Sequence, residues 1–397
     1  MKVCFVALYS YSLFNQKTHY VFGGSEVRAW ILARGLAQRP GCKVGFVVFD
    51  HGQNDREIFG GVTLYKQPYY RSYESAAPVP SWFGRKIQGI RDRLWPQARV
   101  ADLEIDGINF DPAALAAYSD IDADVFVVPG VTNLTAEVLA FCLTHGKRLV
   151  ILAGSDSNFN TAYRPDVTER DVYGNEGRRC HFALTRAHRI IVQTADQAQL
   201  CRTLVGREAA ILANPIDLGE VECSPVADRS YFLWVGKSDT VKRPELLLEI
   251  ARQNPGASFL MVMNKSVEPI HAAILAEAPP NVTIIERLPF QDSDAMFSKA
   301  IALINTSRFE GFPNTFLQAG KYGVPILSLK VDPDGFIARE DCGVVTDGDL
   351  ERLSGAVALL LEDVAKRQVY GERARAYVAR HHALPDRVRE LDMYLRG

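Results

Sequence analysis

Short apolar runs alternate with stretches of helical periodicity along the whole chain. Most of these runs are apolar at every position, which is typical of parallel strands covered by helices on both faces. The first half contains the runs Val3–Leu8, Val44–Phe49, Val125–Val128, Arg148–Leu152 and Arg189–Val192. The second half contains Tyr231–Val235, Ser258–Val262, Val282–Ile285, Ile301–Ile304, Ile326–Leu329 and Val344–Val345. The repeated strand–helix units predict doubly wound α/β architecture twice over, as two domains facing each other across a cleft.

A turn-rich segment divides the two sets of strands. Residues Asn214-Pro215-Ile216-Asp217 through Ser224-Pro225 carry turn formers and no apolar periodicity, so we expect a linker here. At roughly 100–200 residues per domain, the length of 397 residues favours two domains. The sequence therefore predicts an N-terminal domain over 1–215 and a C-terminal domain over 226–383.

The composition indicates which partners the protein binds and in which cell compartment it works. The 45 Lys and Arg against 47 Asp and Glu leave a net charge of −2, whereas a duplex-binding protein usually has a basic excess, so we do not expect nucleic acid as a partner. The 7 cysteines contain no C-x-x-C pair, which favours reduced thiols in the cytosol over a zinc site. No apolar run approaches the roughly 20 residues that cross a bilayer, so we expect a cytoplasmic protein.

Two glycines open the first long helix. After the first strand we expect a loop from Tyr9 to Phe22, and Gly23-Gly24-Ser25-Glu26 then begins a helix. Paired glycines let a ligand approach the backbone N–H groups closely, although a helix cap is the alternative interpretation. The loop lacks G-x-G-x-x-G directly after the strand, so dinucleotide binding loses its main support.

Two lysines follow the first strand of the second domain. Gly236-Lys237 ends the strand, and Lys242 lies in the short loop before a helix that we expect to begin at Pro244. Lysines at the carboxyl end of a strand can neutralise a diphosphate, and each charged hydrogen bond contributes on the order of 1.5–3 kcal/mol. The alternative is that they are solvated surface lysines.

The strongest signal follows a buried strand of the second domain. Glu310 can accept hydrogen bonds from sugar hydroxyls, and Gly311-Phe312-Pro313 permits a tight turn. We expect a helix to begin near Asn314, acting as cap residue, so that the N–H groups of Asn314 and Thr315 suit phosphate oxygens. Gln318, one turn further, could reach a nucleoside ribose. An exposed loop carboxylate is the alternative for Glu310.

Together these segments resemble the retaining glycosyltransferases of family 4 (glycosyl transferases group 1, GT-B fold). The segment Glu310–Pro325 carries most of the resemblance, and the glycine pair, the two-lysine loop and Asn214–Asp217 occur in the same order and at similar separations. The resemblance implies that Glu310 holds the donor sugar and that Lys237 and Lys242 bind the diphosphate. It also implies that Gly24 lies beside the reacting centre.

The resemblance further implies how the chain ends and where it departs from the family pattern. Residues 384–397 would cross back to pack on the first domain. The family commonly has two glutamates separated by seven residues, and here the second is Gln318. A first-domain loop of the family often reads His-Gly-Ser-Asp, and in this chain Ala153 stands in the place of the histidine. Asp156 matches the aspartate of that loop and could orient the acceptor or a donor hydroxyl.

The activity implied is transfer of a sugar from a nucleoside diphosphate sugar to a hydroxyl of a glycan or lipid-linked acceptor, in cell-surface polysaccharide or glycolipid synthesis. No cofactor is expected, because the lysines and a helix N-terminus would stabilise the negative charge of the leaving diphosphate, as a divalent metal does in other enzymes. Two alternatives stay open. One is a metal-dependent transferase using Asp122-Ala123-Asp124 or Asp347-Gly348-Asp349, and the other is a catalytically degenerate nucleotide-sugar-binding partner protein.

A basic amphipathic segment precedes the third predicted strand. Over residues 82–95, apolar side chains fall on one helical face, with arginines and a lysine around it and a tryptophan at each end. Such a helix could lie on an anionic membrane, which would fit a lipid-linked acceptor. An apolar helix face more often packs into a core, so peripheral membrane contact is the second interpretation.

Overall fold

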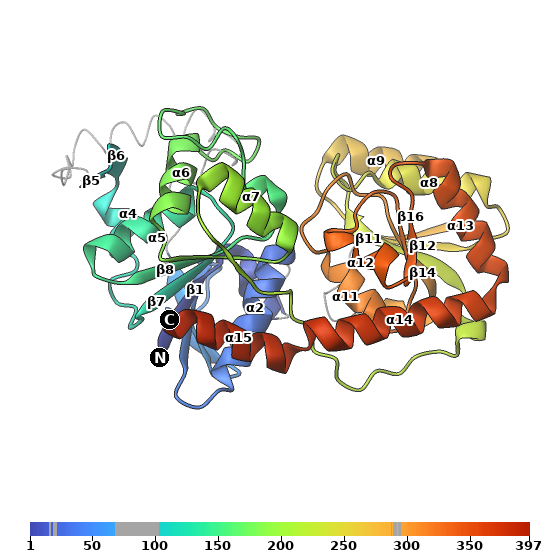
Figure 1. The fold of residues 1–397 in the computed structure, drawn as a ribbon, viewed down its shortest axis with the longest axis horizontal. Coiled ribbons are helices and arrows are strands. Elements are labelled where there is room, and N and C mark those ends of the chain that lie inside the picture. Colours follow the sequence, from blue (N-terminus) through green and yellow to red (C-terminus); the bar gives the residue numbers. More distant parts are fainter. Residues whose placement is uncertain (16, 19–21, 68–102, 287, 289–291, 293–294) are drawn as a thin grey trace.

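The computed structural model describes residues 1–15, 17–18, 22–67, 103–286, 288, 292 and 295–397, and these form two α/β domains side by side (Figure 1). Both ends of the chain lie on the N-terminal domain, because the last helices cross back from the C-terminal domain. The amphipathic segment predicted at 82–95 lies outside the described residues. None of the helices that the structure describes is long and apolar enough to cross a membrane.

The N-terminal domain is built on a sheet that has eight strands in the described part of the chain, in the order β10-β9-β8-β7-β1-β2-β4-β3. All neighbours pair in parallel except β3 with β4. The strands are β1 (Lys2–Val6), β2 (Lys43–Phe49), β3 (Arg56–Phe59), β4 (Val62–Gln67), β7 (Val125–Pro129), β8 (Arg148–Leu152), β9 (Arg189–Val192) and β10 (Ala210–Ile211). A separate antiparallel pair is formed by β5 (Leu103–Ile105) and β6 (Ile108–Phe110).

Helices cover both faces of this sheet, which explains the continuously apolar strands. In β7, Phe126 and Val128 belong to one buried apolar cluster, whereas Val125 and Val127 belong to another. Because successive side chains of a strand point to opposite faces, both faces are core. The helices are α1 (Tyr11–Phe14), α2 (Gly24–Ala37), α4 (Pro112–Ala116), α5 (Asn133–Thr144), α6 (Gly177–Arg186) and α7 (Ala195–Val205).

The C-terminal domain repeats the plan with a parallel sheet in the order β13-β12-β11-β14-β15-β16. Its strands are β11 (Tyr231–Lys237), β12 (Phe259–Asn264), β13 (Val282–Ile285), β14 (Ala300–Asn305), β15 (Ile326–Ser328) and β16 (Gly343–Val345). Its helices are α8 (Pro244–Gln253), α9 (Glu268–Glu277), α11 (Asn314–Lys321), α12 (Phe336–Arg339), α13 (Leu350–Glu362) and α14 (Val364–His382).

The final helix, α15 (Leu384–Arg396), belongs to the N-terminal domain. Figure 1 shows α14 running along the C-terminal domain and α15 continuing onto α2. Val388, Leu391 and Leu395 of α15 join the apolar cluster that contains Leu32 of α2. Residues 384–397 therefore pack on the N-terminal domain, in the place that the resemblance implies.

Every strand predicted from an apolar run is present, with ends that differ by at most two residues. The sequence missed β3, β4, β10 and the separate pair of β5 and β6. The first three lie toward the two edges of their sheet, where strands are not uniformly apolar: Ile58 of β3 is 74% exposed. The loop expected from Tyr9 to Phe22 was wrong in part. The first residues of this segment form a 3-10 turn and then α1. The side chains of Tyr11 and Leu13 in α1 are buried.

Candidate active site

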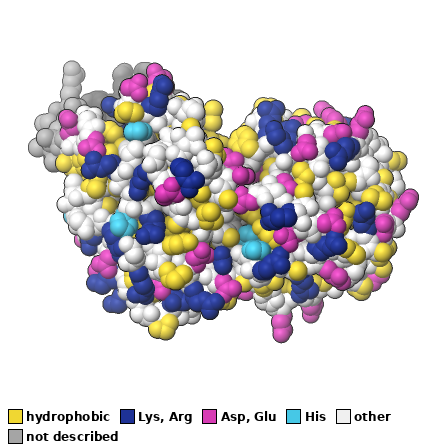
Figure 2. All heavy atoms as spheres, viewed as in Figure 1, with side chains coloured by type: hydrophobic (Ala, Val, Ile, Leu, Met, Phe, Trp, Pro, Cys, Tyr) yellow, Lys and Arg dark blue, Asp and Glu magenta, His cyan; other side chains and the backbone are white. Residues whose placement is uncertain are grey.

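The two sheets present their switch points toward each other. In the N-terminal sheet the chain winds outward in both directions from the β7–β1 boundary, and in the C-terminal sheet from the β11–β14 boundary. Ligands of such sheets bind outside the carboxyl ends of the strands at these points. Loops that follow strands of the two sheets contact each other between the domains, since Asn314 Nδ2 donates to Gly24 O and Gly311 lies against Gly154 O. Figure 2 shows a notch at the upper edge between the two domains.

Glu310 and Lys242 form an ion pair at the C-terminal switch point. Lys242 Nζ lies 2.6 Å from Glu310 Oε2, and the Glu310 side chain is 14% exposed. Glu310 Oε1 accepts hydrogen bonds from Asn305 Nδ2 at 2.9 Å and from Ser307 Oγ at 2.7 Å. Burial by itself would raise the pKa of Glu310, but the charge and hydrogen bond of Lys242, with Ser307 and Asn305, hold that pKa below its usual value. The interpretation of Glu310 as an exposed loop carboxylate is therefore wrong.

The loop that carries Lys242 is fixed by hydrogen bonds at both of its ends. Asp239 Oδ1 accepts from the backbone N–H of Val241 at 3.0 Å and of Lys242 at 2.8 Å. Thr306 Oγ1 donates to Lys242 O at 2.6 Å, which ties the loop to the end of β14. Arg243, with a φ of 50°, starts α8 and donates from Nε to Thr306 O at 2.8 Å. Lys242 is therefore held toward Glu310 by its own backbone.

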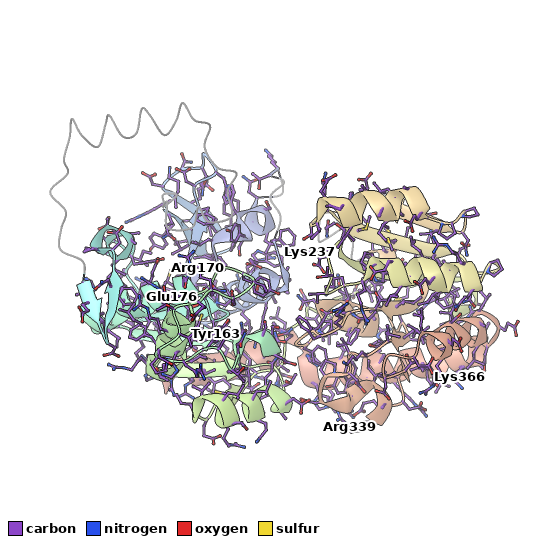
Figure 3. The ribbon with its side chains drawn as sticks, turned by 90° about the horizontal axis from the view of Figure 1, so that it is seen from above. Tyr163, Arg170, Glu176, Lys237, Arg339 and Lys366 are labelled. Atoms are coloured by element: carbon purple, nitrogen blue, oxygen red, sulfur yellow. The ribbon has the colours of Figure 1, made fainter. Side chains whose placement is uncertain are left out.

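Lys237 reaches toward the N-terminal domain from the end of β11. In Figure 3 it lies on the side of the C-terminal domain that faces the other domain, whereas Lys366 lies at the far end. A Cβ atom placed on Gly23 would lie 3.9 Å from Lys237 Nζ. A side chain at position 236 would collide with Trp234, because a Cβ atom on Gly236 would lie 2.7 Å from an atom of the Trp234 ring.

The glycine pair serves as both a cap and a contact. Gly23 N donates to Glu26 Oε2 at 2.9 Å, so the interpretation as a helix cap is correct for Gly23. Gly24 begins α2, and its carbonyl accepts a hydrogen bond from Asn314 Nδ2 of the other domain at 3.3 Å. The start of α2 therefore meets the start of α11.

The turn after Glu310 packs against the N-terminal domain. A Cβ on Gly311 would collide with Gly154 O, so only glycine fits this close approach. Phe312 N donates to Gln193 Oε1 at 2.6 Å. Phe312 O accepts from Asn214 Nδ2 at 2.9 Å. Residues of the N-terminal domain therefore hold the backbone next to Glu310.

The start of α11 differs in one respect from the prediction. Asn314 is the first helical residue, and the cap position is Pro313, whose φ of −62° and ψ of 127° are extended. Asn314 is not the cap because its side chain is used between the domains, on Gly24. Among the described residues no side chain caps this helix, so the N–H groups of Asn314 and Thr315 are available to an anion.

Asp156 and Gln318 lie in different surroundings. Asp156 Oδ1 accepts from Gln197 Nε2 at 3.1 Å, and burial raises the pKa of Asp156, with Asp196 and Asp334 adding repulsion. The side chain of Gln318 is buried, at 3% exposed. The contact of Gln318 with a ribose stays a prediction. Ala153, at the end of β8, is fully buried.

Sequence reasoning missed the polar residues that join the domains. Gln193 and Gln197 link Phe312 to Asp156, since Gln197 Oε1 also accepts from Gln193 N at 3.0 Å. Asp334 accepts from the backbone N–H groups of Ala195 and Asp196 at the start of α7. Gln193 directly follows β9, so an inspection of the first polar residue after every predicted strand would have found it.

One carboxylate of each pair considered for a metal has another partner. Asp122 pairs with Lys2 at 2.8 Å, at the amino end of β7 and away from the crevice. Asp349 caps α13 by accepting from Arg352 N at 3.0 Å. Within the described residues, no group of three or more His, Cys, Asp or Glu side chains could hold a metal ion.

Comparisons with known proteins find sequence similarity in the second half of the chain. Residues 224–377 match the model of the family Glycosyl transferases group 1. A stretch of 129 residues is 26% identical to "Glycosyltransferase 1 domain-containing protein 1" of Xenopus tropicalis, covering 32% of this chain and 37% of that protein's own length. The similarity to this family therefore lies in the C-terminal domain, and the chain spans well under half of the length of the curated relative that it matches.

Solved structures are similar over the whole chain. Sucrose-phosphate synthase of Thermosynechococcus elongatus has a TM-score of 0.72 at 15% identity, covering 100% of this chain and 98% of its own. An α,α-trehalose-phosphate synthase (UDP-forming) of Burkholderia xenovorans, solved with glucose-6-phosphate, has a TM-score of 0.68 at 14% identity and full coverage of both chains. A TarM mutant of S. aureus, solved with UDP, has a TM-score of 0.68 at 10% identity and the same coverage. The predicted GT-B fold is confirmed.

Proposed function

We propose that this protein is a retaining glycosyltransferase of family 4. It moves a sugar from a nucleoside diphosphate sugar to a hydroxyl of a glycan or lipid-linked acceptor, in cell-surface polysaccharide or glycolipid synthesis in the cytoplasm. The observation that carries the proposal is the Lys242–Glu310 pair, which lies at the switch point of the group 1 domain. A cation and a carboxylate held together there suit the two parts of such a donor, its diphosphate and its sugar.

The leaving diphosphate would be bound by the C-terminal domain. Negative charge grows on this group as the anomeric C–O bond breaks, so fixed positive charge aimed at it lowers the barrier. Lys242 and Lys237 supply two ammonium groups, and the uncapped start of α11 supplies backbone N–H groups. These groups would supply the charge stabilisation for which other transferases use a divalent metal.

Glu310 would hold the sugar and not attack it. Both of its oxygens already have partners, Lys242 on Oε2 and Asn305 with Ser307 on Oε1. A carboxylate bound in this way is a weak nucleophile but a firm acceptor for a sugar hydroxyl. A double displacement through Glu310 is therefore disfavoured, and attack by the acceptor on the face that the diphosphate leaves would retain the configuration.

Asp156 would act on the acceptor side. It follows β8 and is linked through Gln197 and Gln193 to the backbone beside Glu310. Burial raises the pKa of Asp156, and its carboxylate can accept a hydrogen bond from a sugar hydroxyl. We assign it to orienting the acceptor hydroxyl or a donor hydroxyl.

The test is an assay of the purified chain with UDP-glucose, UDP-N-acetylglucosamine, GDP-mannose and ADP-glucose. UDP-sugars come first because UDP is present in the TarM structure. We expect release of nucleoside diphosphate from one donor, with EDTA leaving the rate unchanged. Loss of activity in EDTA would favour the metal-dependent alternative. Donor binding with neither hydrolysis nor transfer would favour the degenerate partner protein.

A further inference from the structure

Arg28 is a buried cation on α2 whose guanidinium binds only backbone carbonyls. It is 2% exposed, and in the described part of the chain no carboxylate lies within ion-pair distance of it. Nη1 donates to Ala153 O and Nη2 donates to Leu212 O, each at 2.9 Å, while Nε has no partner among the described residues. Burial lowers its pKa to about 9, which leaves the group charged at neutral pH. An apolar residue would cost less to bury, so stability alone does not explain this arginine.

The carbonyls of Ala153 and Leu212 belong to two backbone segments of the N-terminal domain that lie next to residues in contact with the C-terminal domain. Ala153 is followed by Gly154, whose carbonyl lies against Gly311. Leu212 precedes Asn214, whose side chain donates to Phe312 O at 2.9 Å. The planar fork of Arg28 therefore spans both segments from behind and fixes their separation.

We propose that Arg28 is a positioning residue for sugar transfer, because it sets the acceptor-side wall of the crevice against the turn that follows Glu310. This inference rests on the proposed function. Arg28 does not contact that turn itself; it acts through the Ala153–Asp156 loop and through Asn214. Without its fork the two segments are free to separate, and the loop that carries Asp156 moves relative to the donor sugar.

Loss of the Arg28 contacts should lower the rate of sugar transfer and leave donor affinity unchanged. The groups that would hold the donor are on the C-terminal domain, so weakening the wall leaves donor affinity unchanged. Transfer needs the acceptor hydroxyl placed to about 1 Å, and misplacement on that scale costs up to about a hundredfold in rate. A looser wall also admits water to the anomeric carbon, so hydrolysis rises relative to transfer.

Arg229 offers a matched control. It is also buried, at 6% exposed, and donates to loop carbonyls, from Nη1 to Gly323 O at 2.7 Å and from Nη2 to Tyr322 O at 2.9 Å. No ion pair with a carboxylate is found for it within the described ranges, and its Nε likewise has no partner there. It lies in the C-terminal domain beside α14, away from the crevice. Arg28→Lys and Arg229→Lys therefore remove the same fork geometry from different places.

The experiment compares wild type, Arg28→Lys and Arg229→Lys for affinity to UDP-glucose and the other three donors, transfer rate and the ratio of hydrolysis to transfer. We expect Arg28→Lys to bind the donor within about twofold of wild type, to lose at least about tenfold in transfer and to raise the ratio. Arg229→Lys is expected to change only stability. Equal ratios in all three proteins would overturn the role of Arg28.

Two further arms keep the proposal testable if Arg28→Lys folds poorly or if the wild type is inactive. Asn214→Ala cuts the same connection beyond Leu212 and is expected to raise the hydrolysis ratio with the buried charge intact. Hydrogen exchange needs no activity, and we expect Arg28→Lys to speed exchange at 153–156 and 311–315 whereas Arg229→Lys does not. Unchanged exchange at both segments contradicts the proposal. A wild type inactive on every donor contradicts the proposed function alone.

Discussion

Glu310 shows how a buried carboxylate stays ionised. Burial opposes its charge, and Lys242, Ser307 and Asn305 together outweigh that effect and lower the pKa. Because the folded pKa is below the unfolded one, the group contributes stability above its unfolded pKa and loses it as the pH falls through the folded pKa. The same partners that stabilise the fold also aim the carboxylate at the crevice.

Replacing Lys242 with Met tests this pair. At pH 7 we expect a loss of about 1–3 kcal/mol in the free energy of unfolding, because Glu310 stays buried without its counter-charge. In the variant burial raises the pKa of Glu310, so acidification neutralises it and the deficit shrinks toward pH 4. Donor affinity should fall at least about tenfold. Thermal unfolding at several pH values and donor titration measure both effects.

The matched control is Lys265→Met. Lys265 also pairs with a glutamate, Glu268, but the two side chains are 58% and 65% exposed, so the change should cost less than about 1 kcal/mol and leave donor affinity unaltered. Equal losses in the two variants would remove the special role of Lys242.

Single residues of the site were predictable where a local motif marks them. Lys237 ends strand β11, and Lys242 and Glu310 each follow a strand within a few residues, so the alternation of strands and helices locates them. Arg28 and Gln193 were not predictable in this way, because their partners lie 119 to 184 residues away and include backbone atoms that have no side-chain signature.

At the scale of elements, the crossing from α14 to α15 contains a buried histidine. His382 Nδ1 lies 2.7 Å from Asn214 O, and its ring packs on Phe312 at 4.5 Å between centroids. Since a carbonyl only accepts, Nδ1 carries the proton. Burial lowers the pKa of His382 to about 3, and His381 and Arg387 add repulsion.

This histidine makes the protein sensitive to acid. Below about pH 6.5 the unfolded state takes up a proton that the folded state does not, so stability falls as the pH falls, by about 1.4 kcal/mol per pH unit until the folded pKa is reached. His382→Gln keeps a donor for Asn214 O but does not titrate. We expect its midpoint of thermal unfolding to drop less than that of wild type between pH 6.5 and 4.5. Parallel slopes would contradict the assignment.

The contact of α11 with α14 depends on a glycine. A Cβ on Gly320 would collide with Val378 and lie 2.9 Å from the backbone carbonyl of Ala374. Gly320→Ala is therefore expected to cost about 1–3 kcal/mol in the free energy of unfolding by denaturant. Gly355, on α13, has no atom within 4 Å of its Cβ position, so Gly355→Ala should gain up to about 1 kcal/mol. A gain in both would show that α11 and α14 are not packed this closely.

Elements were predictable to the extent that burial is uniform. Central parallel strands such as β7 and β14 are apolar along their length because both faces are core. The β3 edge strand and the short β10 leave side chains exposed, so their sequences do not differ from loops. The start of α11 near Asn314 was predicted correctly, but the cap position is Pro313 and not Asn314.

At the scale of the whole molecule, a few polar contacts hold the domains together across the crevice. Thr194 caps α7 of the N-terminal domain, and Asp334 of the C-terminal domain accepts from the first two N–H groups of that helix, Ala195 N at 3.0 Å and Asp196 N at 3.2 Å. A carboxylate at a helix N-terminus contributes about 0.3–1 kcal/mol, so we expect Asp334 to stabilise the contact between the domains.

Asp334→Ala tests this contact. We expect the variant to open the domains, which small-angle scattering detects as a larger radius of gyration, and to require more donor for half-maximal rate. Asp349→Ala removes a carboxylate from a helix N-terminus within one domain, at α13, and is expected to lower stability without a change in size. If both variants keep the wild-type radius, Asp334 does not control closure.

The central claim is that the crevice between the domains holds a nucleoside diphosphate sugar on Lys242 and Glu310. Hydrogen exchange of the full chain, with and without the donor selected from the panel, tests it most directly. We expect slower exchange at 236–243 and 306–318, a smaller effect at 153–156 and none at 223–229. Protection that spares 236–243 and 306–318, or that falls on 223–229, would contradict it.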